Sequence, residues 1–255
     1  MEYYLYKCMV YFGKNRVHCT KVDSTNEELK RLFSEKDLEN GTLLTADFQT
    51  GGKGQMGSKW ESDHGDNFLG TFFLRPSLPL SELFVLNMMV SLAVLETVRE
   101  FVKGSVEIKW PNDVLINRQK IAGVLIENKY TGGALTGSFL GIGLNLNQIS
   151  FQKFKRPGTS LKKQGLALIN REEIVKRICF HLQQFYSLYN LKGFETINFL
   201  YHQELYLKGE EHAFLVGKDI RHLTLQSVNK QGDLQLFNQY GKLEEFGLKE
   251  IEFLT

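Results

Sequence analysis

The feature that most constrains the fold is an apolar segment in the first half of the chain. The helix expected from Ser81 to about Lys103 is apolar on most sides, which indicates deep burial. Its most apolar part, Leu83–Leu95, is interrupted by Asn87 and Ser91. It is also shorter than the roughly 20 residues needed to span a bilayer. We therefore expect the core helix of a globular protein.

Length, charge and cysteine content narrow the class further. A chain of 255 residues can hold one sizeable α/β domain, alone or with a small module. A formal charge of +2 is too small to indicate a nucleic-acid or membrane surface by itself. Cys8, Cys19 and Cys179 have no CxxC spacing, which indicates reduced thiols without a zinc site. Without the basic-then-apolar order of a signal peptide at the N-terminus, we expect a cytoplasmic protein.

Helical and β-prone segments alternate along the chain. Helix N-cap chemistry at Asp23–Asn26 precedes one amphipathic run, and the capping-box spacing at Asn170–Glu173 precedes a second. Composition changes near Lys208, after which short alternating strands predict a small β-barrel module. We therefore divide the chain into residues 1–207 and 208–255. The strands expected before that boundary lie near 41–46, 67–74, 107–109, 114–116, 124–127 and 138–146.

The glycine-rich segment Gln49–Trp60 can bring backbone N–H groups and a lysine close to an anion. Its glycines match the G-x-G-x-x-G pattern, which indicates dinucleotide binding only if a helix follows. The residues after Trp60 are a poor helix start. A Walker loop is also excluded, because Ser58-Lys59 follows Gly57 where Gly-Lys-Ser/Thr is required. Phosphate binding and a mobile glycine turn both remain open here.

A second segment, Lys109-Trp110-Pro111-Asn112-Asp113, contains a strong turn signal. The turn places Asn112 and Asp113 at a strand end, and Lys120 is expected to return on the neighbouring strand. Two polar groups and a lysine beside apolar strands are the layout of a site. A surface hairpin with solvated charges is the alternative.

The third segment is Gly141-Ile142-Gly143-Leu144-Asn145. Two glycines in an apolar strand indicate that another group approaches the backbone closely. The Asn145 amide can pair with an adenine edge, although a structural asparagine is equally consistent. The six histidines show no metal-ligand spacing, and His181 is expected to be a satisfied, partly exposed helical residue.

The order of these segments, together with Ser24-Thr25-Asn26 and Lys120-Ile121-Ala122-Gly123, resembles the biotin protein ligase family from about residue 20 onward. The resemblance implies an α+β fold: a mixed, largely antiparallel sheet with helices, related to class II aminoacyl-tRNA synthetases, followed by a small SH3-like barrel. It implies an ATP-dependent ligase that forms biotinyl-5'-AMP and transfers biotin to a lysine of a biotin carboxyl carrier protein. ATP, biotin and Mg²⁺ would be required.

The resemblance also assigns roles to residues. The catalytic residues would be Lys120, Asp113 and Lys53, with Asp113 also organising Mg²⁺. The biotin-binding residues would be Ser24, Thr25, Gln49, Gly52, Lys53 and Lys120. The residues binding ATP or the adenylate would be Gly54, Gln55, Trp60, Asn112 and Asn145.

Two departures from the family pattern are visible. Many members carry arginines where Lys53, Gln55, Met56 and Ser58 stand, which bears on how tightly the adenylate is held. Fewer than about 20 residues precede the first motif, too few for the DNA-binding module of some members, so no nucleic-acid partner is expected. A homodimer is left open. The competing interpretations are a lipoate protein ligase and a non-catalytic biotin or nucleotide sensor.

Overall fold

The larger sheet is organised around a strand that is buried along its whole length. β3 (Phe68–Leu74) is buried at every position and apolar apart from Thr71, as expected for a central strand covered on both faces. The computed structural model describes residues 10–151 and 158–254, and its larger sheet has the strand order β1-β2-β3-β7-β6-β5-β4. The other strands are β1 (Arg16–Val22), β2 (Leu43–Gln49), β4 (Val106–Lys109), β5 (Asp113–Ile116), β6 (Gln119–Thr131) and β7 (Ala134–Leu144).

The pairing pattern confirms a mixed, largely antiparallel sheet. β1 pairs with β2 in parallel, and every other neighbouring pair in the described sheet is antiparallel. The strands predicted near 124–127 and 138–146 belong to a longer hairpin, in which β6 has 13 residues and β7 has 11. The sequence signal was shorter because the outer half of this hairpin is polar and partly exposed, so it lacks the apolar alternation of a core strand.

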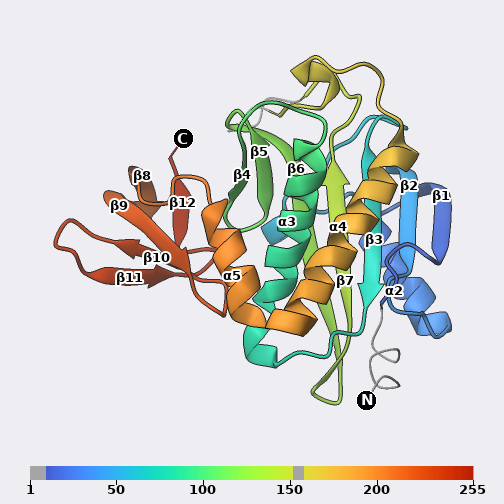
Figure 1. Ribbon diagram of the computed structural model, residues 1–255, viewed down its shortest axis with the longest axis horizontal. Helices are drawn as coiled ribbons and strands as arrows, with labels where there is room; N and C mark the ends of the chain where they lie inside the picture. The colour runs from blue at the N-terminus through green and yellow to red at the C-terminus, as the bar shows by residue number, and fades with distance from the viewer. Residues whose placement is uncertain (1–9, 152–157, 255) are drawn as a thin grey trace.

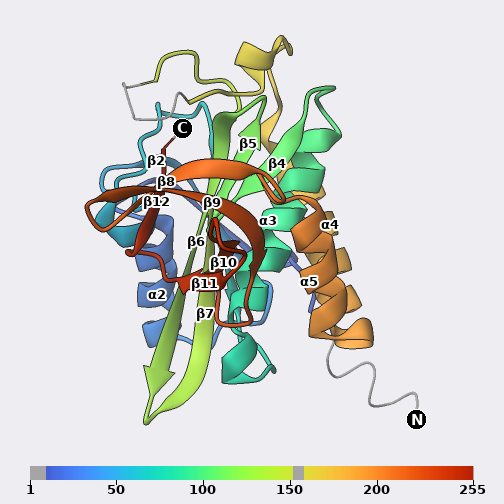
Figure 2. The same cartoon turned by 90° about the vertical axis from the view of Figure 1, so that its left-hand side faces the viewer.

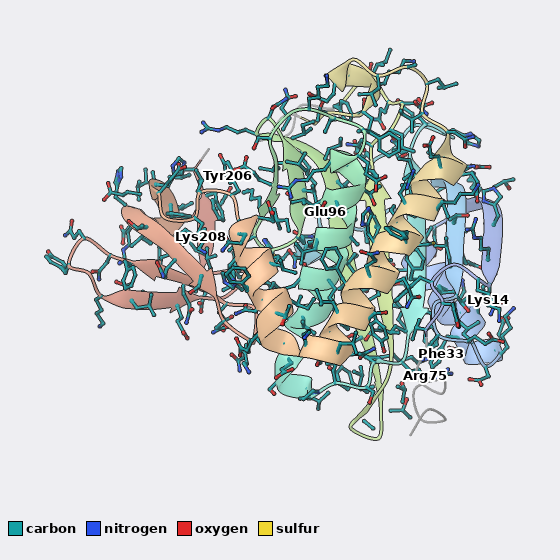
Figure 3. All side chains as sticks on the ribbon, viewed as in Figure 1. Lys14, Phe33, Arg75, Glu96, Tyr206 and Lys208 are labelled. Carbon is teal, nitrogen blue, oxygen red and sulfur yellow. The ribbon has the colours of Figure 1, made fainter. Side chains whose placement is uncertain are left out.

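Helices cover both faces of this sheet. α3 (Phe84–Arg99), α4 (Arg171–Lys192) and α5 (Phe194–Gln203) lie on one face, and α2 (Thr25–Glu35) lies on the other (Figures 1 and 2). The alternation of β3 explains the two layers, because Phe72 packs in the large core and Phe73 in the smaller cluster under α2. Figure 3 shows Phe33 and Arg75 beside each other at this smaller cluster, where the guanidinium lies 5.5 Å from the ring centroid.

The predicted core helix is confirmed as α3, which is shorter than the range 81–103. A separate 3-10 turn, Leu80–Glu82, precedes it. Within the part of the chain that the structure describes, Leu80–Arg99 is the one helical stretch that is long and apolar enough to cross a membrane, and 72% of its most apolar 18-residue window is buried inside the fold. Its burial is that of a core helix, with neighbours in α4 and α5.

The C-terminal strands form a second, antiparallel sheet, as the composition change near Lys208 predicted. Figure 3 shows Tyr206 and Lys208 at the junction, and the sheet begins at Glu211. The Trp110 indole joins the two sheets by donating to the Gly232 carbonyl at 2.8 Å. The strands, in the order β11-β10-β9-β8-β12, are β8 (Glu211–Val216), β9 (Asp219–Val228), β10 (Leu234–Phe237), β11 (Leu243–Phe246) and β12 (Ile251–Phe253).

Candidate active site

One cavity of about 210 Å³ gathers most of the predicted site residues. It lies where the N-terminus of α2 and the glycine loop meet strands β5, β6 and β7. The predicted residues that line it come from β2, the N-terminus of α2, the glycine loop, β5 and β6: Ser24, Thr25, Gln49, Lys53, Gly54, Gln55, Trp60, Asn112, Asp113 and Lys120. Segments that are separated by up to about a hundred residues in the sequence therefore form one site.

A neutral hydrogen-bonding cluster forms one part of the cavity. The Gln49 Oε1 atom accepts from the Thr25 backbone N–H at 2.7 Å, and the Thr25 hydroxyl lies 3.1 Å from the same oxygen. The Thr71 hydroxyl supports them from the buried side, 2.8 Å from the Thr25 hydroxyl. Ser24 occupies the N-cap position of α2, but its side chain makes no capping bond. The Ser24 hydroxyl and the Gln49 NH₂ group are therefore available to a ligand.

Lys120 and Asp113 form an ion pair at the cavity, with 2.6 Å between Nζ and the carboxylate. The antiparallel register of β5 and β6 sets Leu115 opposite Lys120 and Asp113 opposite Gly123, so Asp113 is a diagonal neighbour of Lys120 across the two strands. Asn112 fixes the start of β5, since its amide donates to the Val124 carbonyl at 2.6 Å. The expected return of Lys120 on the neighbouring strand is confirmed.

Trp60 packs on a part of the sheet where two glycines, Gly123 and Gly143, leave room for its ring. A Cβ atom at Gly143 would stand 2.4 Å from the Trp60 ring, and one at Gly123 would stand 3.1 Å from it. The Lys120 ammonium lies 5.5 Å from the ring centroid. Among the described residues the buried indole Nε1 has no hydrogen-bond partner. The close approach predicted from the glycines of β7 is confirmed, and the approaching groups are Trp60 at Gly143 and Asn26 at Gly141.

The glycine loop forms a short hairpin of its own. Its backbone bonds run from Gly54 N to Ser58 O at 2.7 Å and from Trp60 N to Gly52 O at 2.9 Å. Lys53 leaves this hairpin toward α2, where its ammonium donates to Glu27 at 2.7 Å. That bond raises the pKa of Lys53 and lowers the pKa of Glu27, so both groups stay charged.

Two predicted site residues stand apart from the cavity lining. Gly52 is not among the residues that line the cavity, and a Cβ there would stand 2.4 Å from the Trp60 carbonyl oxygen. Asn145 is buried, and its amide donates to the Thr159 carbonyl at 2.9 Å. Among the described residues its Oδ1 has no partner, which leaves a buried acceptor.

Sequence reasoning missed several residues that line the cavity. Asn26 is the most informative, since its amide donates to Glu127 at 2.7 Å and its Oδ1 lies 2.6 Å from the Thr71 hydroxyl. A polar residue buried in the first turn of an amphipathic helix was the available signal. The other missed residues are Met56, Ser58, Gly123, Val124, Leu125, Gly141, Ile142 and Gly143.

Within the described ranges, no three His, Cys, Asp or Glu side chains form a group that could hold a metal ion. Among the described residues that line the cavity, Asp113 is the single carboxylate. Cys19 and Cys179 are free thiols, and Cys8 lies outside the described residues. His181 is partly buried on α4 and contacts Glu100 at 2.9 Å, which confirms its structural interpretation.

Comparison with known proteins gives a consistent result. Residues 19–145 match the model of the biotin/lipoate A/B protein ligase family. The chain is 29% identical over 240 residues to the bifunctional ligase/repressor BirA of Bacillus spizizenii, covering 90% of this chain and 71% of that protein. With its counterpart from Bacillus subtilis the identity is 30% over 219 residues, covering 85% and 65%.

A solved structure of biotin protein ligase from Aquifex aeolicus in complex with biotin and ATP superposes with a TM-score of 0.77. The identity is 27%, covering 94% of this chain and 98% of that one. Sequence and structure agree over both sheets of the molecule. By this match the chain belongs to the biotin/lipoate A/B protein ligase family, and the similar solved structure is that of a biotin protein ligase.

Proposed function

We propose that this protein activates biotin with ATP to form biotinyl-5'-AMP and transfers the biotin to a specific lysine of a biotin carboxyl carrier protein. The observation that carries the proposal is the composition of the cavity. A neutral hydrogen-bonding cluster at Ser24, Thr25 and Gln49 shares one cavity with the ammonium groups of Lys53 and Lys120. A ligand with an uncharged polar head and an anionic end fits this combination.

The neutral cluster suits the ureido group of biotin, which has one acceptor and two donors. Because the Gln49 Oε1 is occupied by Thr25, its NH₂ group can donate to the ureido oxygen. The hydroxyls of Ser24 and Thr25 can accept from the ureido N–H groups. A lipoate head has no such groups, and burying this cluster against it would leave polar atoms unpaired.

The two lysines suit the adenylation step, in which a carboxylate and a triphosphate approach each other. Lys120, placed by the sheet, and Lys53, placed by the loop, would offset the repulsion between these anions. Gly52, Gly54 and Gln55 would complete the loop that covers the adenylate and excludes water. Trp60 is proposed to stack on adenine. The Oδ1 of Asn145, which has no partner among the described residues, is proposed to accept from the adenine amino group.

Asp113 is assigned two tasks in this proposal. Mg²⁺ is commonly held by one or two carboxylates together with substrate phosphates, so a single cavity carboxylate fits an ion that arrives with ATP. The ion would neutralise phosphate charge, with Asn112 beside it. In the transfer step the acceptor lysine must be neutral, and the Asp113 carboxylate can take its proton. The attacking nitrogen then forms the amide, and AMP leaves.

The finer architectural predictions belong to the same proposal. We infer an SH3-like arrangement for residues 208–255 and a catalytic unit over 1–207. No nucleic-acid partner and a cytoplasmic location are expected, and a homodimer is left open.

The test uses the purified full chain with ATP, Mg²⁺ and either biotin or lipoate. Pyrophosphate release and acid-labile acyl-AMP are followed, and a biotin carrier domain is then added. Biotin-dependent pyrophosphate and a biotinylated carrier lysine are the expected results. Lipoate-dependent release would instead identify a lipoate ligase, and biotin binding without pyrophosphate would identify a sensor.

A further inference from the structure

The loop lysine that lines the cavity is held by a carboxylate from outside it. Glu27 lies in the first turn of α2, and its Oε1 accepts from the Lys53 ammonium at 2.7 Å. Lys53 is among the described residues that line the cavity, and Glu27 is not. The position of the loop cation is therefore set from the helix behind it.

Glu27 is itself fixed by further charges. Lys30 donates to the same Oε1 at 3.1 Å and pairs with Glu127 of β6 at 2.8 Å. Glu127 in turn accepts from the cavity residue Asn26 at 2.7 Å. A connected series of charged and polar groups thus joins the sheet, the helix and the glycine loop, and it begins and ends at the cavity.

The bond to Glu27 does not consume the lysine. An ammonium has three donors, so Lys53 can bond Glu27 and still donate to a phosphate. The Lys53 side chain is 51% exposed and that of Glu27 is 29% exposed, so solvent screens their attraction. Such a pair changes an equilibrium constant by only a few-fold, which suits a contact that orients a loop without locking it.

We propose that Glu27 is a positioning residue for adenylation, holding the Lys53 ammonium at the cavity before ATP arrives. The inference rests on the proposed function, and it requires that Glu27 act through Lys53. The adjacent Glu28 offers a matched control, because it lies in the same helical turn and pairs with Arg31 at 2.6 Å.

The decisive experiment is a double-mutant cycle of Glu27→Gln and Lys53→Gln, with KM for ATP and kcat of adenylation measured at saturating biotin. Glu27→Gln should raise KM for ATP by about 3- to 5-fold and change kcat by less than about twofold. In the Lys53→Gln background the same replacement should have no further effect. Glu27→Asp should fall between Glu27→Gln and the unmodified chain, and Glu28→Gln should match the unmodified chain.

An equal effect of Glu27→Gln in both backgrounds, or no effect in either, would overturn the proposal. A second readout needs no turnover: tryptic cleavage after Lys59, inside the loop, should be several-fold faster in Glu27→Gln and unchanged in Glu28→Gln. If the unmodified chain releases no pyrophosphate with biotin, the proposed function fails. In that case the tryptic cleavage rate still tests whether Glu27 anchors the loop. Equal rates in Glu27→Gln and the unmodified chain would reject the anchoring role as well.

Discussion

The β5–β6 hairpin and the glycine loop each bring a lysine to the same cavity, but they hold it differently. Lys120 lies in a strand bonded on both sides, with Asp113 set beside it by the register of the sheet. Lys53 lies in a small hairpin of glycines and is oriented by a carboxylate of α2. The difference indicates a division of labour: the sheet preorganises the charge that acts on the reacting groups, and the loop supplies an adjustable cover.

The largest expected effect tests the hairpin. Lys120→Ala should lower the single-turnover rate of biotin-dependent pyrophosphate release by roughly 10²–10³, the scale for removing one preorganised charge-stabilising group. Lys129→Ala is the matched control, because Lys129 lies on the same strand and bonds Ser34 at 2.9 Å, outside the cavity. A near-normal rate in Lys120→Ala would show that Lys120 of the β5–β6 hairpin does not stabilise the charge of the reacting groups.

The second prediction compares a glycine of the sheet with a glycine of the loop. In Gly143→Ala the new methyl would stand 2.4 Å from the Trp60 ring, so the ring or the strand must move. Because Trp60 is proposed to stack on adenine, we expect ATP affinity by calorimetry to fall about tenfold, the scale of moderate overpacking. Gly51→Ala should bind ATP normally, since its methyl would meet an ordinary contact at 3.5 Å. An equal loss of affinity in both variants would show that the contact with Trp60 does not distinguish Gly143 from Gly51.

The β5–β6 hairpin could be predicted because the residues that specify it lie close together in the sequence. The turn at Asn117 and Arg118, both in the left-handed region, is separated by only a few residues from Asp113 and Lys120. The turn signal that ends at Asp113 and the β-prone runs near 114–116 and 124–127 were enough to place the two charges on neighbouring strands. Their pairing then followed from antiparallel geometry.

The surroundings of the loop could not be predicted in the same way. The glycines of the loop indicated either a phosphate-binding segment or a mobile turn. They did not indicate that Trp60 packs on Gly123 and Gly143, which belong to strands far along the chain. Nothing in the local sequence links Glu27 to Lys53. N-cap chemistry was predicted over Asp23–Asn26, and Ser24 does occupy the N-cap of α2, yet its side chain makes no capping bond. Such contacts are decided by tertiary packing, which short motifs do not encode.

A smaller effect is expected from restoring a charge to the loop. Gln55 lines the cavity where many family members carry arginine. Gln55→Arg should slow the loss of the adenylate by about 3- to 10-fold, because a guanidinium can bond phosphate through two parallel N–H groups. Gln55→Lys, which adds charge without that geometry, should give a smaller effect. Release of labelled biotinyl-AMP from the preformed complex measures both, and unchanged release in Gln55→Arg would place this residue away from the phosphate.

The smallest effect concerns the pH dependence of the loop anchor. The pKa of Glu27 is lowered, first by its bond from Lys53, so above the ordinary carboxyl pKa the pair stabilises the loop in the position that the structure shows. That contribution is lost only as the pH falls through the lowered pKa of the folded state. The raised pKa of Lys53 keeps the ammonium charged on the alkaline side.

Protection of the loop from proteolysis should therefore stay constant around neutral pH and weaken only in acid. Because the pair is partly exposed, added salt should weaken it by a few-fold at constant pH. The hairpin pair, held by the sheet, should keep its geometry under the same salt, so Lys120-dependent turnover at saturating ATP should change less than loop protection. Loop protection that titrates near neutral pH would contradict the assignment, since neither Glu27 nor Lys53 changes charge there. Another group would then have to anchor the loop. Glu27 of α2 would no longer explain how Lys53 is held, and the contrast with Lys120, which the sheet holds, would need a different basis.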